Sequence, residues 1–70
     1  MITLTDTCTP MTPLTCKHGD YTRFKAWFAL VPGFTAYDAA KWAQRAMRGL
    51  NGDRTALTQL ESAGFTITVG

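Results

Sequence analysis

An alanine-rich stripe between residues 35 and 50 constrains the fold more than any other feature of this sequence. Apolar residues recur there at i, i+3, i+4 and i+7, the spacing that places side chains on one face of an α-helix. Thr35 stands at the N-cap position with Asp38 three residues later, and Asn51-Gly52 ends the pattern. Because alanine is small, neighbouring elements can approach this helix closely. The stripe consists of Ala36, Ala39, Ala40, Ala43, Ala46, Met47 and Leu50.

A shorter helix and two strands complete the regular pattern. Asp53 is a suitable N-cap for a helix that ends near Gly64, with an inward side made of Ala56, Leu57, Leu60 and Ala63. Residues 65–69 alternate apolar side chains with threonine, and residues 2–5 do the same, so both ends of the chain are predicted to be strands. We expect these strands to pair with each other, since each would otherwise leave an edge unpaired.

Residues 20–31 fit two periodicities. Tyr21, Phe24, Phe28 and Val31 recur at helical spacing, whereas Phe24, Ala26, Phe28 and Leu30 recur at strand spacing. We favour a helix, because it places more of the large residues on one face and has Asp20 as an N-cap. The alternative is a β-hairpin that exposes Arg23, Lys25 and Trp27 on one face.

We predict an α+β fold in which two or three helices pack on a small two-stranded sheet formed by the N- and C-terminal strands. The chain has 70 residues, enough for a single small domain over residues 1–70. Its hydrophobic content of 46% excludes a disordered chain. Residues 6–19 are rich in threonine and interrupted by Pro10 and Pro13, so we expect an irregular segment there.

The sequence carries no signal for a membrane or for secretion. Its first residues have neither the cationic start nor the apolar core of a signal peptide. The longest apolar run, residues 26–32, is far shorter than the roughly 20 residues of a membrane span. We therefore expect a cytoplasmic protein without a membrane partner, in which Cys8 and Cys16 stay reduced.

Cys8, Cys16 and His18 are weak candidates for a metal site. Structural zinc uses four ligands, usually in two close pairs, and here a carboxylate would have to be the fourth. Free thiols explain the cysteines better, with a disulfide as a further alternative. The chain has one histidine and no phosphate-binding glycine motif, so we predict no cofactor and no catalytic site.

Positive charge is concentrated in the later part of the chain. The net charge of +2 divides into −1 for residues 1–20, with one lysine and two aspartates, and +3 for residues 21–70, with six basic and three acidic residues. A basic row opposite the alanine stripe can meet phosphates or an acidic protein surface, although ordinary solvation also explains it. The row consists of Lys41, Gln44, Arg45, Arg48 and, at the start of the next helix, Arg54.

Further candidate contacts lie on the second helix and among the aromatic residues. Thr55, Thr58 and Gln59 are outward-facing, and such side chains can contact phosphate oxygens and base edges. Trp27, Tyr37 and Trp42 lie off the alanine stripe. Large aromatic side chains outside a core are typical of interfaces, although in so small a domain they could equally belong to the core.

Residues 33–69 resemble a winged helix-turn-helix DNA-binding domain. The resemblance rests on the helix that opens at Thr35, on residues 54–59, and on the step Leu60-Glu-Ser-Ala-Gly-Phe65 into a strand. It implies that Arg54, Thr55, Thr58 and Gln59 read the DNA groove, and that Lys41, Arg45 and Arg48 contact the backbone.

Two non-enzymatic functions follow from these patterns. We favour binding of DNA, or of RNA, through the basic helical face. The alternative is a small phage-type inhibitor that blocks a host nucleic-acid-processing complex by protein contact. For that alternative, the chain resembles anti-CRISPR proteins only in its small size and general organisation.

Overall fold

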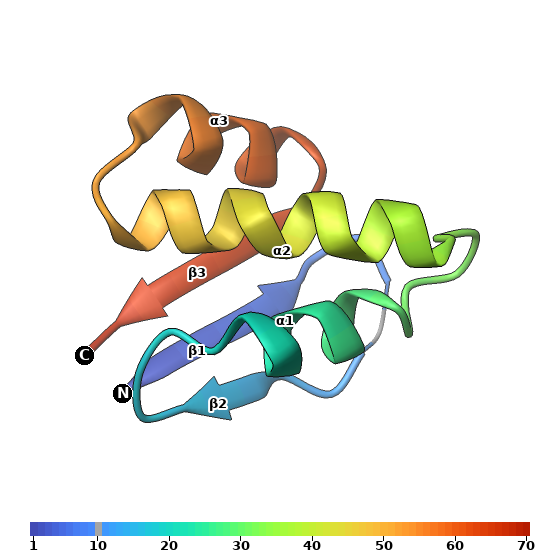
Figure 1. Ribbon diagram of the computed structural model, residues 1–70, viewed down its shortest axis with the longest axis horizontal. Helices are drawn as coiled ribbons and strands as arrows, with labels where there is room; N and C mark the ends of the chain where they lie inside the picture. Colours follow the sequence, from blue (N-terminus) through green and yellow to red (C-terminus); the bar gives the residue numbers. More distant parts are fainter. Residues whose placement is uncertain (10) are drawn as a thin grey trace.

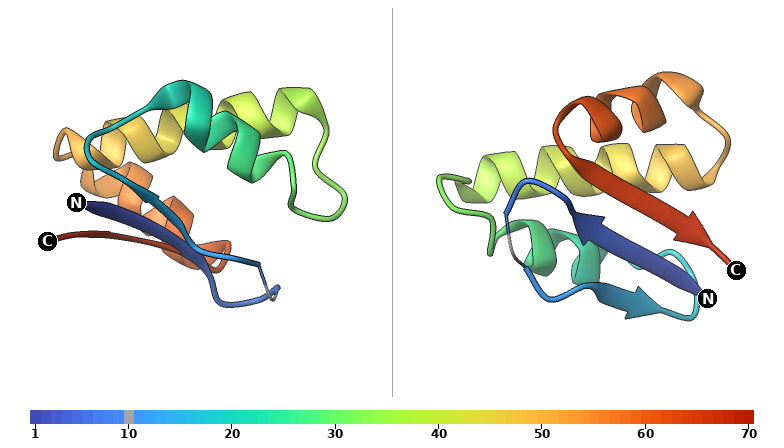
Figure 2. Two further views of the ribbon diagram at one scale, coloured as in Figure 1. Left: turned by 90° about the horizontal axis from the view of Figure 1, so that it is seen from below. Right: turned by 180° about the vertical axis from the view of Figure 1, so that it is seen from behind.

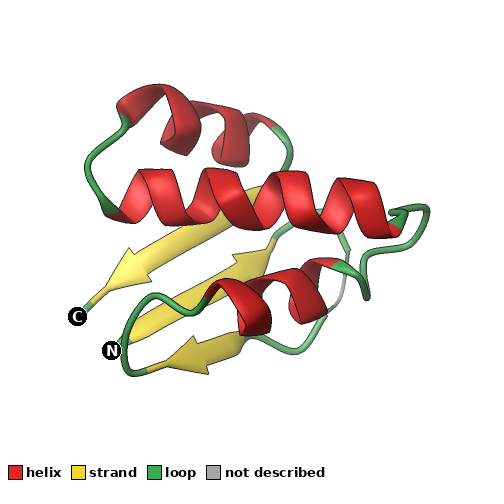
Figure 3. Ribbon diagram, in the orientation of Figure 1, coloured by secondary structure: helices red, strands yellow, loops and turns green. Residues whose placement is uncertain are grey.

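The computed structural model describes residues 1–9 and 11–70, and it confirms an α+β fold. Pro10, one of the two prolines expected to interrupt residues 6–19, lies outside the described residues. Three helices pack on one three-stranded sheet, in the arrangement that Figures 1 and 3 show. In chain order the elements are β1 (Ile2–Asp6), β2 (Leu14–Cys16), α1 (Tyr21–Phe28), α2 (Ala36–Leu50), α3 (Arg54–Ser62) and β3 (Phe65–Val69).

The sheet is antiparallel with the order β2-β1-β3. The two terminal strands pair as expected, from Ile2 opposite Val69 to Asp6 opposite Phe65. The expectation of two strands was wrong, because Leu14–Cys16 forms a third strand against β1 inside the segment expected to be irregular. A three-residue strand that follows a proline is too short to show alternation in the sequence, and only its pairing with Ile2–Leu4 defines it.

The helices gather on one face of the sheet, and Figure 2 shows the other face uncovered by any of them. The buried residues of the strands, which pack under the helices, are apolar: Ile2, Leu4, Cys16 and Phe65. The uncovered face carries a threonine at each alternate position, and three cross-strand pairs consist of threonine alone. These threonines are Thr3, Thr5, Thr15, Thr66 and Thr68.

Residues 21–28 form a helix and not a hairpin. The Asp20 carboxylate accepts the backbone N–H of Arg23 at 3.2 Å and so caps α1, while Phe24 and Phe28 are fully buried. Val31 is also buried, but Tyr21 was wrongly assigned to the inward face, since its position in the first turn leaves it 36% exposed.

Of the two possibilities left open for Trp27, an interface or the core, the structure shows the core: only 5% of its surface is accessible. Its indole Nε1–H donates to the Thr12 carbonyl at 2.9 Å, which satisfies the one polar group of the side chain. Its ring also makes edge contacts with Phe28 and Phe65. Trp27 is therefore a core residue that joins α1 to the sheet.

The rings of four aromatic side chains surround Phe65, the first residue of β3. Their centroids lie 5.0–6.0 Å from that of Phe65, in edge-to-face or tilted geometry. The four residues come from α1, from the loop before α2 and from α2 itself: Trp27, Phe28, Phe34 and Trp42. This aromatic cluster connects the C-terminal strand to α1, to the loop before α2 and to α2.

The alanine stripe of α2 faces the core largely as predicted. Ala39, Ala43 and Ala46 are buried, and Ala40, Met47 and Leu50 are half-buried. Ala36 is an exception: it is the first helical residue and is exposed, because it lies at the end of the helix beyond the packed layer. On the side of α3, Gly49 lets Leu57 come so close that a Cβ at residue 49 would lie 2.8 Å from its Cδ2.

A turn after β1 packs against the turn that precedes β3. The Asp6 carboxylate accepts the backbone N–H groups of Cys8 and Thr9, and the N–H of Thr7 donates to the Gly64 carbonyl at 2.8 Å. Gly64 has φ +92°, in the left-handed region that closes α3 as predicted. No helix formed by residues 1–9 and 11–70 combines the length and the apolar character needed to cross a bilayer.

Substituting Gly64 tests this packing. A Cβ there would contact the Cys8 sulfur and lie 3.2 Å from its Cβ, in addition to the backbone strain, whereas Gly52, with φ +97°, has no atom within 4 Å. We expect Gly52→Ala to lower the free energy of unfolding by about 1–2 kcal/mol, because alanine disfavours the left-handed conformation. Gly64→Ala should lower the free energy of unfolding by the same amount and by about 1–3 kcal/mol more, because the added methyl group overpacks against Cys8. Urea denaturation measures both; equal losses would contradict the packing of Cys8 against Gly64.

Candidate nucleic-acid interface

The side of α2 that faces away from the sheet carries the basic row. Tyr37, Lys41, Gln44 and Arg48 are all exposed there, at helical spacings of four, three and four residues. Tyr37 is 75% exposed and shares this side with the polar residues, as its position off the alanine stripe indicated. The helix therefore presents one continuous polar side, and its direction is fixed by the buried alanines beneath it.

α3 packs against α2 and carries the other predicted contact residues. It lies beside α2 and runs back along it after a short turn, as Figure 1 shows. Its buried residues Ala56 and Leu60 face inward, which leaves every predicted contact residue of this helix exposed. The Thr58 hydroxyl donates to the Arg54 carbonyl at 2.9 Å, so it can only accept a further hydrogen bond. The exposed residues are Arg54, Thr55, Thr58 and Gln59.

Arg45 lies at the edge of this surface and is half-buried. Its guanidinium carbon stands 4.5 Å from the centroid of the Trp42 ring, a cation–π contact. Trp42 is itself half-buried and stacks on Phe34 at 6.2 Å. Trp42 thus belongs partly to the core, and its ring restricts the position of the Arg45 charge.

The cations of α2 and α3 have no carboxylate within ion-pair distance among the described residues. Among the described residues, the ion pair that does form joins Arg23 of α1 to Asp20, the N-cap of that helix, at 3.7 Å. Asp38 and Asp53 instead cap α2 and α3: the Thr35 N–H donates to Asp38 at 3.0 Å, and the Ala56 N–H donates to Asp53 at 3.2 Å. Most of the positive charge on this surface is therefore available to a partner.

The Thr35–Asp38 capping box also changes the acidity of its carboxyl group. The Asp38 carboxylate accepts the backbone N–H and then the hydroxyl of Thr35, and both bonds hold its pKa below the ordinary value of 3.8. Lys41 adds a weaker attraction in the same direction. Asp38 therefore stays ionised at the N-terminus of α2, where negative charge is favourable.

The residues considered for a metal do not converge. Cys8 is exposed beside Gly64, whereas Cys16 is buried at the end of β2, and both thiols are unlinked. Across residues 1–9 and 11–70, no three His, Cys, Asp or Glu side chains form a group that could hold a metal ion.

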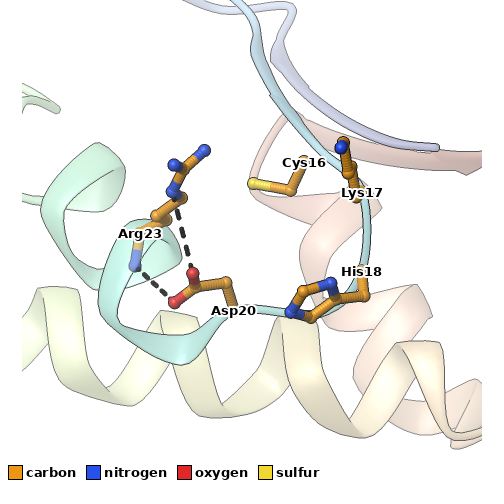
Figure 4. A pocket seen from close by; sticks show the side chains of 5 residues that line it. All are labelled: Cys16, Lys17, His18, Asp20 and Arg23. Atoms are coloured by element: carbon orange, nitrogen blue, oxygen red, sulfur yellow. Dashed lines mark hydrogen bonds and ion pairs between the residues drawn. The ribbon is translucent and has the colours of Figure 1, made fainter.

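A pocket between β2 and α1 was not foreseen from the sequence. Figure 4 shows its five lining residues, with the Cys16 sulfur directed toward α1. Its volume is about 310 Å³. The pairing of β2 with β1 creates it, because this brings residues 16–18 opposite the first turn of α1, and no local pattern signals that arrangement. The lining consists of Cys16, Lys17, His18, Asp20 and Arg23.

Comparison with protein-family models, with curated proteins and with solved structures finds no match to this chain.

The capping box gives a pH-dependent prediction. Because the pKa of Asp38 is lower in the folded state, its contribution to stability is fully present above the unfolded value of 3.8. This contribution is lost as the pH falls through the lower folded pKa. Asp38→Ala should therefore lower the midpoint of thermal unfolding at pH 7, and the difference from the parent protein should shrink on acidification below 3.8. A difference that does not vary with pH would contradict the charged capping box.

Proposed function

We propose that this protein is a non-enzymatic nucleic-acid-binding protein that binds duplex DNA through the exposed side of α2 and α3. The observation that carries the proposal is a group of cations on adjacent helices without ion-pair partners among the described residues. We refer to this surface as the basic face, formed by Lys41, Gln44, Arg45, Arg48, Arg54, Thr55, Thr58 and Gln59.

The side chains of the basic face divide into two roles. Lys41, Arg45 and Arg48 contact phosphates, which fixes the position of the protein on DNA and supplies most of the affinity. The α3 residues contact the groove, where Gln59 can pair with the edge of an adenine and an arginine with that of a guanine. This division follows the resemblance to winged helix-turn-helix domains, where α3 of this chain would correspond to the recognition helix.

Salt dependence tests the phosphate contacts. Lys41 and Arg48 are exposed and make no packing contact that defines the core, so Lys41→Gln with Arg48→Gln should leave the fold intact. The slope of log K against log salt is negative, and each lost phosphate contact reduces its magnitude by about 0.9. The double variant should therefore reduce the magnitude by about 2. Fluorescence anisotropy with a labelled duplex at several salt concentrations measures the slope.

The matched control is Lys17→Gln with Lys25→Gln, which removes the same charge from residues outside α2 and α3. Its slope should stay close to that of the parent protein. An equal decrease in both double variants would indicate a non-specific charge effect and would contradict the basic face. Absence of any binding at low salt, to duplex or single-stranded probes, would rule the proposal out.

Gln59→Ala separates base reading from backbone contact. If Gln59 pairs with a base edge, its loss should reduce discrimination between the preferred and other sequences by about 1–3 kcal/mol, while binding to non-specific DNA stays nearly unchanged. A selection from random duplexes, carried out with both proteins, supplies the preferred sequence and measures the ratio. An unchanged ratio would contradict base reading by this residue.

A second candidate function is inhibition of a nucleic-acid-processing complex by protein contact. Tyr37 favours it, because it is 75% exposed on the polar side of α2, and tyrosine is enriched in protein interfaces. Tyr37→Ala distinguishes the two candidates. It should disrupt a protein complex recovered with the parent chain, and it should leave the salt slope of DNA binding unchanged because it removes no lysine or arginine.

A further inference from the structure

A groove runs between β2 and α1, on the part of the molecule made by neither α2 nor α3. It consists of two adjoining pockets that share Arg23. One is the pocket of about 310 Å³ at the Cys16 end of β2, and the other, of about 340 Å³, lies at the Leu14 end. The second pocket is mainly apolar and is lined by Leu14, Arg23, Ala26, Trp27 and Leu30. We refer to the two as the cationic pocket and the apolar pocket.

β2 forms one wall of this groove and has a free edge. The order β2-β1-β3 pairs β2 on one side only, within the part of the chain that the structure describes. A free edge can accept an extended segment as an additional strand through main-chain hydrogen bonds. Pro13 before β2 and Lys17 after it keep this edge short, which limits indefinite self-pairing.

The spacing of the two pockets matches the repeat of a β-strand. Leu14 lines the apolar pocket and Cys16 the cationic pocket, and both side chains lie on the helical side of the sheet opposite Leu4 and Ile2. Side chains two residues apart in a strand project from the same face, roughly 7 Å from each other. An added strand can therefore place two alternate side chains in the two pockets.

The charges indicate what the cationic pocket accepts. Lys17 and Arg23 supply two positive charges there, with His18 beside them. The opposing carboxylate, Asp20, caps α1 and already contacts Arg23, at 3.2 Å from its backbone nitrogen and 3.7 Å from its Nε. The pocket keeps an excess of positive charge, which complements a carboxylate. Leu30, 71% exposed at the other end, lacks an apolar partner over most of its surface.

We propose that the groove binds an extended acidic segment of a partner protein, which adds to the free edge of β2 as an antiparallel strand. Because β2 runs from the apolar to the cationic pocket, the segment carries an acidic residue and, two positions later, a large apolar residue. A second copy of this chain does not provide that pattern from its sheet edges, since neither β2 nor β3 contains a carboxylate. The proposal concerns a surface separate from the basic face and is independent of DNA binding.

Two peptides of identical composition test the proposal. The first is the capped peptide Ser-Thr-Asp-Thr-Leu-Thr-Ser, in which Asp and Leu share one face of a strand. The second is Ser-Thr-Asp-Leu-Thr-Thr-Ser, in which they point to opposite faces. Titration of the ¹⁵N-labelled protein, followed by amide chemical shifts, should show the first peptide perturbing residues of β2 and α1 with about tenfold tighter binding than the second.

Substitutions in α1 and at its C-cap, Ala29, supply the matched controls. Ala26 lines the apolar pocket and Ala29 does not, and both are exposed, so Ala26→Glu and Ala29→Glu add the same group inside and outside the groove. Ala26→Glu should weaken binding of the first peptide about tenfold, and Ala29→Glu by less than about twofold. Arg23→Gln should weaken it by about threefold to tenfold and reduce its dependence on salt.

Several results would overturn the proposal. They are equal affinity for the two peptides, perturbed amides on α2 and α3 in place of β2 and α1, or no perturbation at millimolar peptide. A dimer in analytical ultracentrifugation with β2 protected from hydrogen exchange would overturn it as well, because a second copy would then occupy the edge. Far-ultraviolet circular dichroism of each variant establishes that α1 is retained before binding is compared.

Discussion

The packing of aromatic rings around Phe65 is the interaction on which the rest of this structure depends. Phe65 begins the last strand of the chain, yet its ring contacts residues from α1, from the loop before α2 and from α2. β3 pairs with one edge of β1, and its first residue, Phe65, packs against the aromatic side chains of the helical layer. The same residue therefore joins the sheet to the helices. In a chain whose core is so small, one well-packed cluster carries a large share of the buried apolar surface.

The local parts of this fold could be predicted from the sequence. α2 and α3 follow from helical periodicity and from the caps at Thr35 and Asp53, because capping and side-chain spacing act over a few residues. The pairing of the terminal strands followed from the need to satisfy two exposed edges. β2 was missed because three residues carry almost no periodic signal, and its existence depends on pairing with β1.

The same distinction applies to the two surfaces proposed to bind partners. The exposure of most of the basic face could be predicted, since residues opposite a buried stripe are exposed whatever the helix packs against. The half-burial of Arg45 against Trp42 could not. The burial of Trp27 could not be predicted, because it depends on Thr12 and Phe65, which are distant in sequence. The groove between β2 and α1 is also a tertiary feature. Neither Arg23 nor Leu14 is unusual where it stands in the sequence, and only the fold brings them together.

The threonines on the uncovered face of the sheet give the molecule two sides with different responses to solvent. Each of Thr3, Thr5, Thr15, Thr66 and Thr68 combines a β-branched side chain, which suits a strand, with a hydroxyl that water can solvate. None of them ionises in the physiological range. These five side chains therefore offer hydrogen-bonding groups without charge, in contrast to the cations exposed on α2 and α3.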